Sequence, residues 1–193
     1  MPHKILTLAA SNNAHSINRA LVEHAAQVLK SEFLQDAEID TLDINDFEMP
    51  IYRADREQND GIPEAAQAFY DRITAADALM IFFPEHNGTY SAAYKNLFDW
   101  ASRIKMAIYQ DKPAVFLAAS PGGRGAAKVL EFAVTTAPFF WAKVVGSMSV
   151  GKFGEAFDKD TGMLSGSEHA DALNAALSAL AHTLQGQDSL AAA

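Results

Sequence analysis

The sequence predicts an α/β domain in which a parallel five-stranded sheet lies between two layers of helices. Segments with a strand pattern alternate with segments of helical periodicity along the whole chain, which is typical of parallel sheets built from βαβ units. Two apolar runs, Ala78–Phe83 and Pro113–Ala119, are continuous, as expected for central strands that are buried on both faces. The 193 residues are 49% hydrophobic and contain no linker, repeat or low-complexity block, so we expect one domain over residues 1–193.

Two strands and one helix are expected at the start of the chain. Lys4–Ala10 is an apolar run of strand length, and Asn18–Phe33 repeats apolar residues at helical intervals along one face. Glu38–Ile44 alternates apolar and polar residues, which is the pattern of a half-buried second strand.

A long loop is expected before the two most apolar strands. Residues Asn45–Ile62 show no periodic pattern and contain a proline and a glycine. Pro63 suits the first turn of a helix that continues to Thr74. The third strand, Ala78–Phe83, is followed by a helical pattern at Ser91–Ile104.

The last part of the chain completes the alternation. The fourth strand, Pro113–Ala119, precedes a helical pattern at Gly125–Trp141 that Pro138 is expected to end early. The remaining expected segments are a fifth strand at Lys143–Val150, a loop at Gly151–Gly166, a helix at Glu168–Leu184 and a frayed tail over residues 185–193. Five strands alternating with helices suit a flavodoxin-like three-layer sandwich with strand order 2-1-3-4-5.

The composition excludes several kinds of function. The chain has no cysteine, so it has no disulfides, thiolate nucleophiles or sulfur-ligated metal sites, and redox chemistry would need a bound cofactor. Its six histidines show no metal-ligand spacing, so we expect no metal site. A net charge of −9 makes nucleic acid and anionic membranes poor partners. No signal peptide or apolar segment of about 18 residues is evident, so we expect a cytoplasmic protein.

The negative charge is concentrated in one part of the chain. Residues 31–71 contain twelve acidic residues and only two basic ones, Arg53 and Arg56. In contrast, residues 1–22 contain no acidic residue and residues 112–154 contain only Glu131. A solvated acidic face that aids solubility is one interpretation. The other is that the two acid-poor segments meet at an anion-binding site.

The loops after strands 1, 3 and 4 are the candidate site, because ligands of such sheets bind beyond the carboxyl ends of the strands. Residues 11–18 carry hydroxyl and amide side chains, contain no acid and lead into a helix N-terminus, which favours a phosphate. Ordinary helix capping by Ser16 or Asn18 is the alternative.

The other two loops are rich in turn residues. Asn87-Gly88 marks a tight turn with positive φ, whose backbone can approach a flat ligand closely. Glu85 is either a site residue or a cap for a neighbouring element. Residues 120–125 contain three glycines, which allow the backbone to lie against a ring or phosphate, although a flexible turn would have the same composition.

Five motifs together resemble a known family. They are PEHNG at residues 84–88, KNLFDW at 95–100, the serine and asparagine pattern at 11–18, FEMPIY at 47–52 and SPGGRG at 120–125. The chain is similar in these motifs to the NAD(P)H-dependent FMN reductases, a flavodoxin-like group that includes quinone, chromate and azo-dye reductases.

The resemblance implies that the first loop holds the FMN phosphate and that the other two border the isoalloxazine ring. The residues implied in cofactor binding are Ser11, Asn13, Ser16, Ile17, Asn18, Pro84, Glu85, His86, Asn87, Gly88, Ser120, Gly122 and Gly123. No catalytic side chain is expected, because the cofactor carries the chemistry.

The chain departs from the family pattern at several positions. Asn13 replaces the arginine of the phosphate loop, Ala10 replaces a glycine, His86 replaces a tyrosine, and Ser91-Ala92 replaces Pro-Gly. The missing arginine removes one charge-assisted contact with phosphate. The affinity for FMN and the preference between NADPH and NADH therefore stay open.

The expected function is an FMN-dependent oxidoreductase that transfers hydride from NADPH or NADH through FMN to a small-molecule acceptor. The acceptor would be a quinone, an azo compound, a metal oxyanion or free flavin. The alternatives are a flavodoxin-type electron carrier that docks a partner through residues 31–71, and a flavodoxin-like protein that has lost FMN. The resemblance also implies a homodimer or homotetramer, for which Tyr90, Tyr94, Phe98 and Trp100 offer aromatic surface unless they pack in the core.

Overall fold

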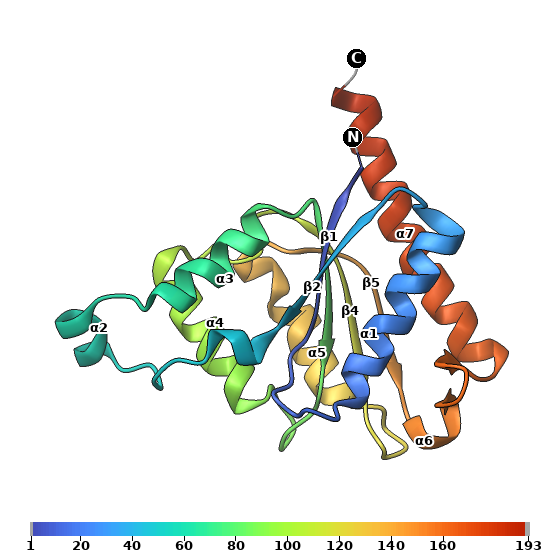
Figure 1. The fold of residues 1–193 in the computed structure, drawn as a ribbon, viewed down its shortest axis with the longest axis horizontal. Helices are drawn as coiled ribbons and strands as arrows, with labels where there is room; N and C mark the ends of the chain where they lie inside the picture. The colour runs from blue at the N-terminus through green and yellow to red at the C-terminus, as the bar shows by residue number, and fades with distance from the viewer. Residues whose placement is uncertain (1, 192–193) are drawn as a thin grey trace.

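The computed structural model describes residues 2–191 and has a five-stranded parallel sheet at its centre (Figure 1). The strands are β1 (Lys4–Ala9), β2 (Glu38–Asp43), β3 (Ala78–Phe83), β4 (Pro113–Ala119) and β5 (Lys143–Val150). Their order is β2-β1-β3-β4-β5, and every neighbouring pair is parallel. The predicted fold class and strand order are confirmed.

Helices cover both faces of the sheet. They are α1 (Ile17–Val28), α2 (Ala54–Asp60), α3 (Glu64–Thr74), α4 (Ala92–Ile104), α5 (Ala127–Thr136), α6 (Phe153–Ala156) and α7 (Ser167–Ala191). In Figure 1, α1 and α7 lie on one side of the sheet and α3, α4 and α5 on the other. A short hairpin, β6 (Phe157–Asp158) with β7 (Met163–Leu164), precedes α7.

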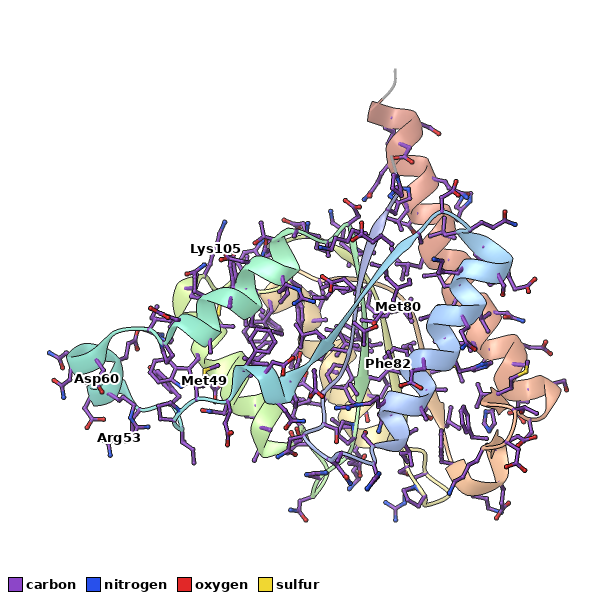
Figure 2. All side chains as sticks on the ribbon, in the orientation of Figure 1. Met49, Arg53, Asp60, Met80, Phe82 and Lys105 are labelled. Atoms are coloured by element: carbon purple, nitrogen blue, oxygen red, sulfur yellow. The ribbon has the colours of Figure 1, made fainter. Side chains whose placement is uncertain are left out.

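The central strand β3 shows how the sequence builds two cores. All six of its residues are buried, and successive side chains point to opposite faces. Leu79, Ile81 and Phe83 pack in the core under α3, α4 and α5. Met80 and Phe82, labelled in Figure 2, belong to the core under α1 and α7. A continuous apolar run is therefore required wherever both faces are covered.

The segment predicted as a loop, Asn45–Ile62, contains helical turns, although its sequence shows no apolar periodicity. A 3₁₀ turn spans Ile44–Phe47, and α2 follows at Ala54–Asp60 without burying any residue. Figure 2 shows Arg53 and Asp60 of this region at the edge of the molecule, away from the sheet. Acidic residues in the first turn of α2 favour its N-terminus, and Gly61 with φ 77° ends it. An unburied helix lacks the apolar stripe by which helices are predicted.

The other boundaries differ where local geometry intervenes. In the predicted helix Asn18–Phe33, the α-helical part α1 ends at Val28 and a π turn follows. The predicted helix Gly125–Trp141 is divided into α5 and a 3₁₀ turn that contains Pro138, as expected. The predicted loop Gly151–Gly166 contains α6 and the β6–β7 hairpin.

The last helix is longer than the predicted segment Glu168–Leu184. Helix α7 continues to Ala191, because the residues after Leu184 include good helix formers such as alanine, leucine and glutamine. His3 at the start of the chain also lies 3.0 Å from Asp188. Residues 192–193 lie outside the described residues.

Four of the twelve acidic residues in segment 31–71 form ion pairs within the described residues: Asp40, Asp43, Asp55 and Glu57. Asp40 on β2 accepts hydrogen bonds from Arg72 of α3, one at 3.0 Å, and lies 3.3 Å from Lys4 of β1. Partial burial disfavours the charged form of Asp40, but the bonds and charges of Arg72 and Lys4 outweigh it and lower its pKa. Asp43 is paired with Arg19 at 2.6 Å. The segment is therefore not simply a solvated acidic face. Over residues 2–191, no helix is both long and apolar enough to cross a bilayer.

Ser91 joins the start of α4 to the end of β1. Its hydroxyl donates to the carbonyl of Ala10 at 2.7 Å and accepts from the backbone N–H of Tyr94 at 3.2 Å. The side chain is buried, with 1% exposure. A serine cap therefore opens α4.

We expect Ser91→Ala to lower the free energy of unfolding by about 1–2 kcal/mol, because it removes a cap and leaves a buried carbonyl without its donor. Chemical denaturation measures this loss. Ser31→Ala is the matched control, since the exposed Ser31 hydroxyl makes only a long local bond, and its effect should stay within about 0.5 kcal/mol. Equal effects of the two substitutions would contradict this role of Ser91.

His24 joins α1 to the β6–β7 hairpin and is almost fully buried. Its ring packs edge-on against Phe157, and its Nε2 atom faces the N–H of Leu164 at 3.5 Å. Burial lowers the pKa of His24 below its ordinary value. The unfolded chain then binds this proton more readily, so the stability associated with neutral His24 is complete above about pH 6.5 and declines as the pH falls.

The free energy of unfolding should therefore fall between about pH 6.5 and 5, before the carboxylates with lowered pKa begin to protonate. His24→Gln keeps an acceptor but does not titrate in this range, so its stability should change less with pH. Denaturation midpoints measured across this interval test the idea. Parallel curves for the two proteins would overturn it.

Candidate functional site

The loops after β1, β3 and β4 meet at the carboxyl edge of the sheet, the lower edge in Figure 1. The N–H of Ala10 donates to the carbonyl of Phe82 at 2.8 Å, which joins the ends of β1 and β3. Asn18 joins the start of α1 to the end of β4. The acid-poor segments 1–22 and 112–154 therefore meet in space, as one interpretation of the charge pattern expected.

Asn18 lies against β4 through both functions of its amide. Its Oδ1 accepts from the backbone N–H of Ala119 at 3.0 Å, and its Nδ2 donates to the carbonyl of Ala119 at 3.2 Å. The side chain is 1% exposed. The Asn18 side chain therefore anchors the loop after β1 to the end of β4. The side chain is fully engaged there, and only the backbone N–H of Asn18 remains as a donor at the start of α1.

The first loop leaves backbone donors free at the N-terminus of α1. Ser16 is the N-cap residue, yet its hydroxyl makes no capping bond. The N–H groups of Arg19 and Ala20 bond to the carbonyl of Ser16, whereas those of Ile17 and Asn18 have no backbone acceptor among the described residues. No acidic residue lies in the first turn. This end of α1 can therefore accept an anion.

Ser11 and Asn13 shape the same loop. The buried Ser11 hydroxyl accepts from the N–H of Asn13 at 3.3 Å, and Oδ1 of Asn13 accepts from the N–H of His15 at 2.9 Å. Asn13, which stands where the family has arginine, is thus engaged in a local turn.

The second loop is a tight hairpin turn. His86 and Thr89 exchange two backbone hydrogen bonds, at 3.0 and 3.2 Å. Asn87 and Gly88 between them have φ values of 53° and 84°, as a type I′ turn requires. The predicted positive-φ turn is present, and the side chains of His86 and Asn87 are exposed at its tip.

Glu85 caps the helix that follows the third loop. Its Oε2 accepts from the N–H groups of Lys128 and Val129 at 3.1 and 3.2 Å. A carboxylate at this position satisfies N-terminal donors and interacts favourably with the helix dipole. Of the two roles considered for Glu85, the structure shows the cap, while Pro84 beside it is buried.

The third loop is held in shape by the end of β5. Backbone bonds join Ser120 to Val150 and Phe153, and Gly122 to Lys152. A Cβ on Gly151 would lie 2.6 Å from the carbonyl oxygen of Gly123, so only glycine fits there. The loop is therefore ordered, with Gly122 and Gly123 exposed. Gly151 was missed as a site-forming residue, because its contact partner is distant in the sequence.

The motifs at residues 47–52 and 95–100 are joined by hydrogen bonds. Asn96 bonds to Tyr52 and Met49 backbone groups at 2.8 and 3.1 Å, and the Trp100 indole donates to the carbonyl of Pro50 at 2.7 Å. These contacts hold segment 47–52 against α4. Together they wall a cavity of about 460 Å³ that reaches Asn12, which the sequence did not predict.

Substitution of Asn18 should destabilise the fold far more than substitution of Ser16. Asn18→Ala should lower the free energy of unfolding by about 2 kcal/mol, because it leaves both buried polar groups of Ala119 unpaired. Ser16→Ala removes no capping bond and should change it by less than about 0.5 kcal/mol. Urea denaturation of the two variants compares them directly, and a larger loss for Ser16→Ala would refute these assignments.

The chain was compared with known proteins. The profile of the family described as NADPH-dependent FMN reductase matches residues 3–155. The chain is 34% identical to the NAD(P)H-dependent FMN reductase PA1204 of Pseudomonas aeruginosa over 65% of this chain and 64% of that protein. It is 30% identical to the NAD(P)H:quinone oxidoreductase of Solanum tuberosum over 95% of both chains.

A solved structure is also similar over nearly its full length. The flavoenzyme NAD(P)H:(acceptor) oxidoreductase FerB of Paracoccus denitrificans superposes with a TM-score of 0.72 at 25% identity, covering 95% of this chain and 98% of that one. The chain spans under two thirds of the length of several curated relatives that it matches, between 58% and 64%. The profile match covers most of the chain, and the chain therefore belongs to the NADPH-dependent FMN reductase family.

Proposed function

We propose that this chain binds FMN in the three-loop cluster and acts as an NAD(P)H-dependent oxidoreductase. The observation that carries the proposal is the N-terminus of α1, where the Ser16 hydroxyl and the N–H groups of Ile17 and Asn18 are free and the first turn contains no acidic residue. A phosphate dianion fits this donor set. Family membership supports the same cofactor.

The other two loops fit the flat part of the cofactor. The turn at Asn87-Gly88 and the glycines at 122 and 123 present backbone with little side-chain bulk. We propose that the backbone of Pro84–Gly88 and Ser120–Gly123 borders the ring. Ser11 and Asn13 would act by holding the phosphate loop in shape.

Bound FMN would supply the redox chemistry, by accepting a hydride from a nicotinamide and passing electrons to an acceptor. The protein's part is to position the cofactor and to leave one face open to the nicotinamide and acceptor. Two contacts perform this positioning: Asn18 fixes the phosphate loop to β4, and Glu85 fixes the ring-side turn to α5.

We propose a quinone as the acceptor, because the relative from Solanum tuberosum is named as a quinone oxidoreductase. An azo compound, a metal oxyanion or free flavin are the other candidates. A steady-state rate with each acceptor, at equal NADPH and NADH, ranks them.

We also propose a cytoplasmic homodimer or homotetramer. Tyr90, Tyr94, Phe98 and Trp100 are all buried in the core and are not available for it. Exposed apolar side chains occur elsewhere, among them Ile51, with 77% of its surface exposed, and Phe139, with 73%. Sedimentation velocity tests the proposal, and a species of only 20.8 kDa would contradict it.

The alternative electron carrier has weaker support in the structure. Its proposed docking surface, residues 31–71, has several carboxylates already paired: Asp40 with Arg72, Asp43 with Arg19 and Glu57 with Arg103. Sustained NAD(P)H oxidation by the isolated protein would exclude a carrier as the main role. A failure to bind FMN would instead identify a chain that has lost its cofactor.

Added FMN should bind the purified protein and show the visible absorbance of a protein-bound flavin. Ser16→Ala should weaken FMN binding about tenfold, because one hydrogen bond to a charged phosphate is lost. Equilibrium titration monitored by flavin fluorescence measures both affinities. The control is Ser189→Ala, a serine exposed on α7, which should bind FMN as the unmodified protein does. If the unmodified protein takes up no FMN, the proposed function fails.

A further inference from the structure

Two cationic side chains beside the three-loop cluster have no acidic partner. Arg124 lies in the third loop and Lys128 in the first turn of α5, and both are exposed. Within residues 2–191, neither forms an ion pair. Other cations near the carboxyl edge are neutralised: Arg19 by Asp43, Lys95 by Asp99 and Lys152 by Glu155.

Lys128 is held over the turn that borders the proposed ring site. A Cβ on Gly88 would lie 3.8 Å from Cδ of Lys128, so the aliphatic part of this side chain passes along the turn. The Glu85 carboxylate fixes that arrangement by accepting from the backbone N–H of Lys128 itself. The Lys128 ammonium group therefore extends from the rim of the cluster.

Arg124 lies in the third loop, four residues before Lys128, and backbone contacts hold this loop in place. Gly125, with φ 60°, packs so closely on the end of β5 that a Cβ there would lie 2.7 Å from the backbone nitrogen of Gly151. Gly122 is also bonded to Lys152. The residues on both sides of Arg124 are thus fixed, while its guanidinium group stays exposed.

The acids nearest in sequence do not neutralise the pair. Glu85 is engaged by two N–H groups of α5. Glu131 lies one turn beyond Lys128 and is exposed, without an ion pair to it among the described residues. Residues 112–154 contain no other acid. The rim at Arg124 and Lys128 therefore has a net positive charge that favours an anion.

This anion is not the phosphate of FMN, since free donors for that group lie at the start of α1, after β1. NADPH differs from NADH by a single 2′-phosphate. A guanidinium can bind phosphate oxygens in a bidentate manner, and an ammonium adds a point charge. We propose that Arg124 and Lys128 bind the 2′-phosphate of NADPH and make the chain selective for NADPH over NADH. This inference rests on the proposed function.

The test uses the FMN-loaded protein and the oxidised nucleotides, so that no turnover occurs. NADP⁺ and NAD⁺ are titrated by calorimetry into the unmodified protein and into Arg124→Gln, Lys128→Gln and Lys105→Gln. Lys105 is the matched control, because it is an exposed lysine with no ion pair to any residue in 2–191 and lies away from the lower edge in Figure 2.

We expect the unmodified protein to bind NADP⁺ at least about tenfold more tightly than NAD⁺. Arg124→Gln and Lys128→Gln should each weaken NADP⁺ binding about five- to tenfold and leave NAD⁺ binding unchanged. Lys105→Gln should alter neither. The fragments 2′,5′-ADP and 5′-AMP should show the same difference, and added salt should weaken the phosphorylated ligands more.

Three outcomes would overturn the inference. Equal weakening of NADP⁺ and NAD⁺ would place the pair on the shared pyrophosphate. Unchanged affinities for both nucleotides would show that the pair does not contact the nucleotide. A raised KM for chromate or a sulfonated azo dye at an unchanged nucleotide ratio would assign the pair to an anionic acceptor. Absence of FMN binding by the unmodified protein is a separate result, which contradicts the proposed function itself.

Discussion

The arrangement of the candidate site depends on one buried amide. Asn18 at the start of α1 bonds to both backbone groups of Ala119 at the end of β4, across 101 residues of sequence. Because the end of a strand has unpaired backbone groups and the start of a helix has free donors, a single side chain can link the two. The loops after β1 and β4 are consequently held together. The loop after β3 is attached to α5 because its Glu85 carboxylate accepts from the N–H of Lys128. The donors of the proposed cofactor site therefore belong to a rigid frame.

Acidic side chains are concentrated in a different part of the chain from the segments that form this frame. Some carboxylates of the acidic segment 31–71 are paired within the fold, as in the Lys4–Asp40–Arg72 cluster that joins β1, β2 and α3. The acid-poor segments 1–22 and 112–154 meet at the edge of the sheet where the loops lie. The carboxylate of Glu85 in the second loop is engaged by helix N–H groups. A phosphate-bearing cofactor and an anionic nucleotide can then approach a protein of net charge −9 without facing its acids.

How far each feature could be predicted depends on the range of the interaction behind it. The turn at Asn87-Gly88 was predictable, because positive φ is a local requirement of those two residues. The strands were predictable, because continuous burial leaves an apolar run. Helix α2 was not, because it buries nothing. The sequence left the role of Glu85 undecided, because its partners are N–H groups of α5 far along the chain. Nothing in the sequence indicated the role of Gly151, because that role depends on contact with the distant carbonyl of Gly123.

The sequence by itself determined the class of fold, the order of the strands, the loops of the candidate site and the family motifs. These follow from periodicity and from local backbone preferences, which are properties of neighbouring residues. Only the tertiary structure decided that the Asn18 side chain is an anchor, that Ser16 and two N–H groups are the free donors, and that Lys128 lies along Gly88. A hydrogen-bonding side chain is compatible with several roles, and the partner that the fold brings within about 3 Å selects one of them.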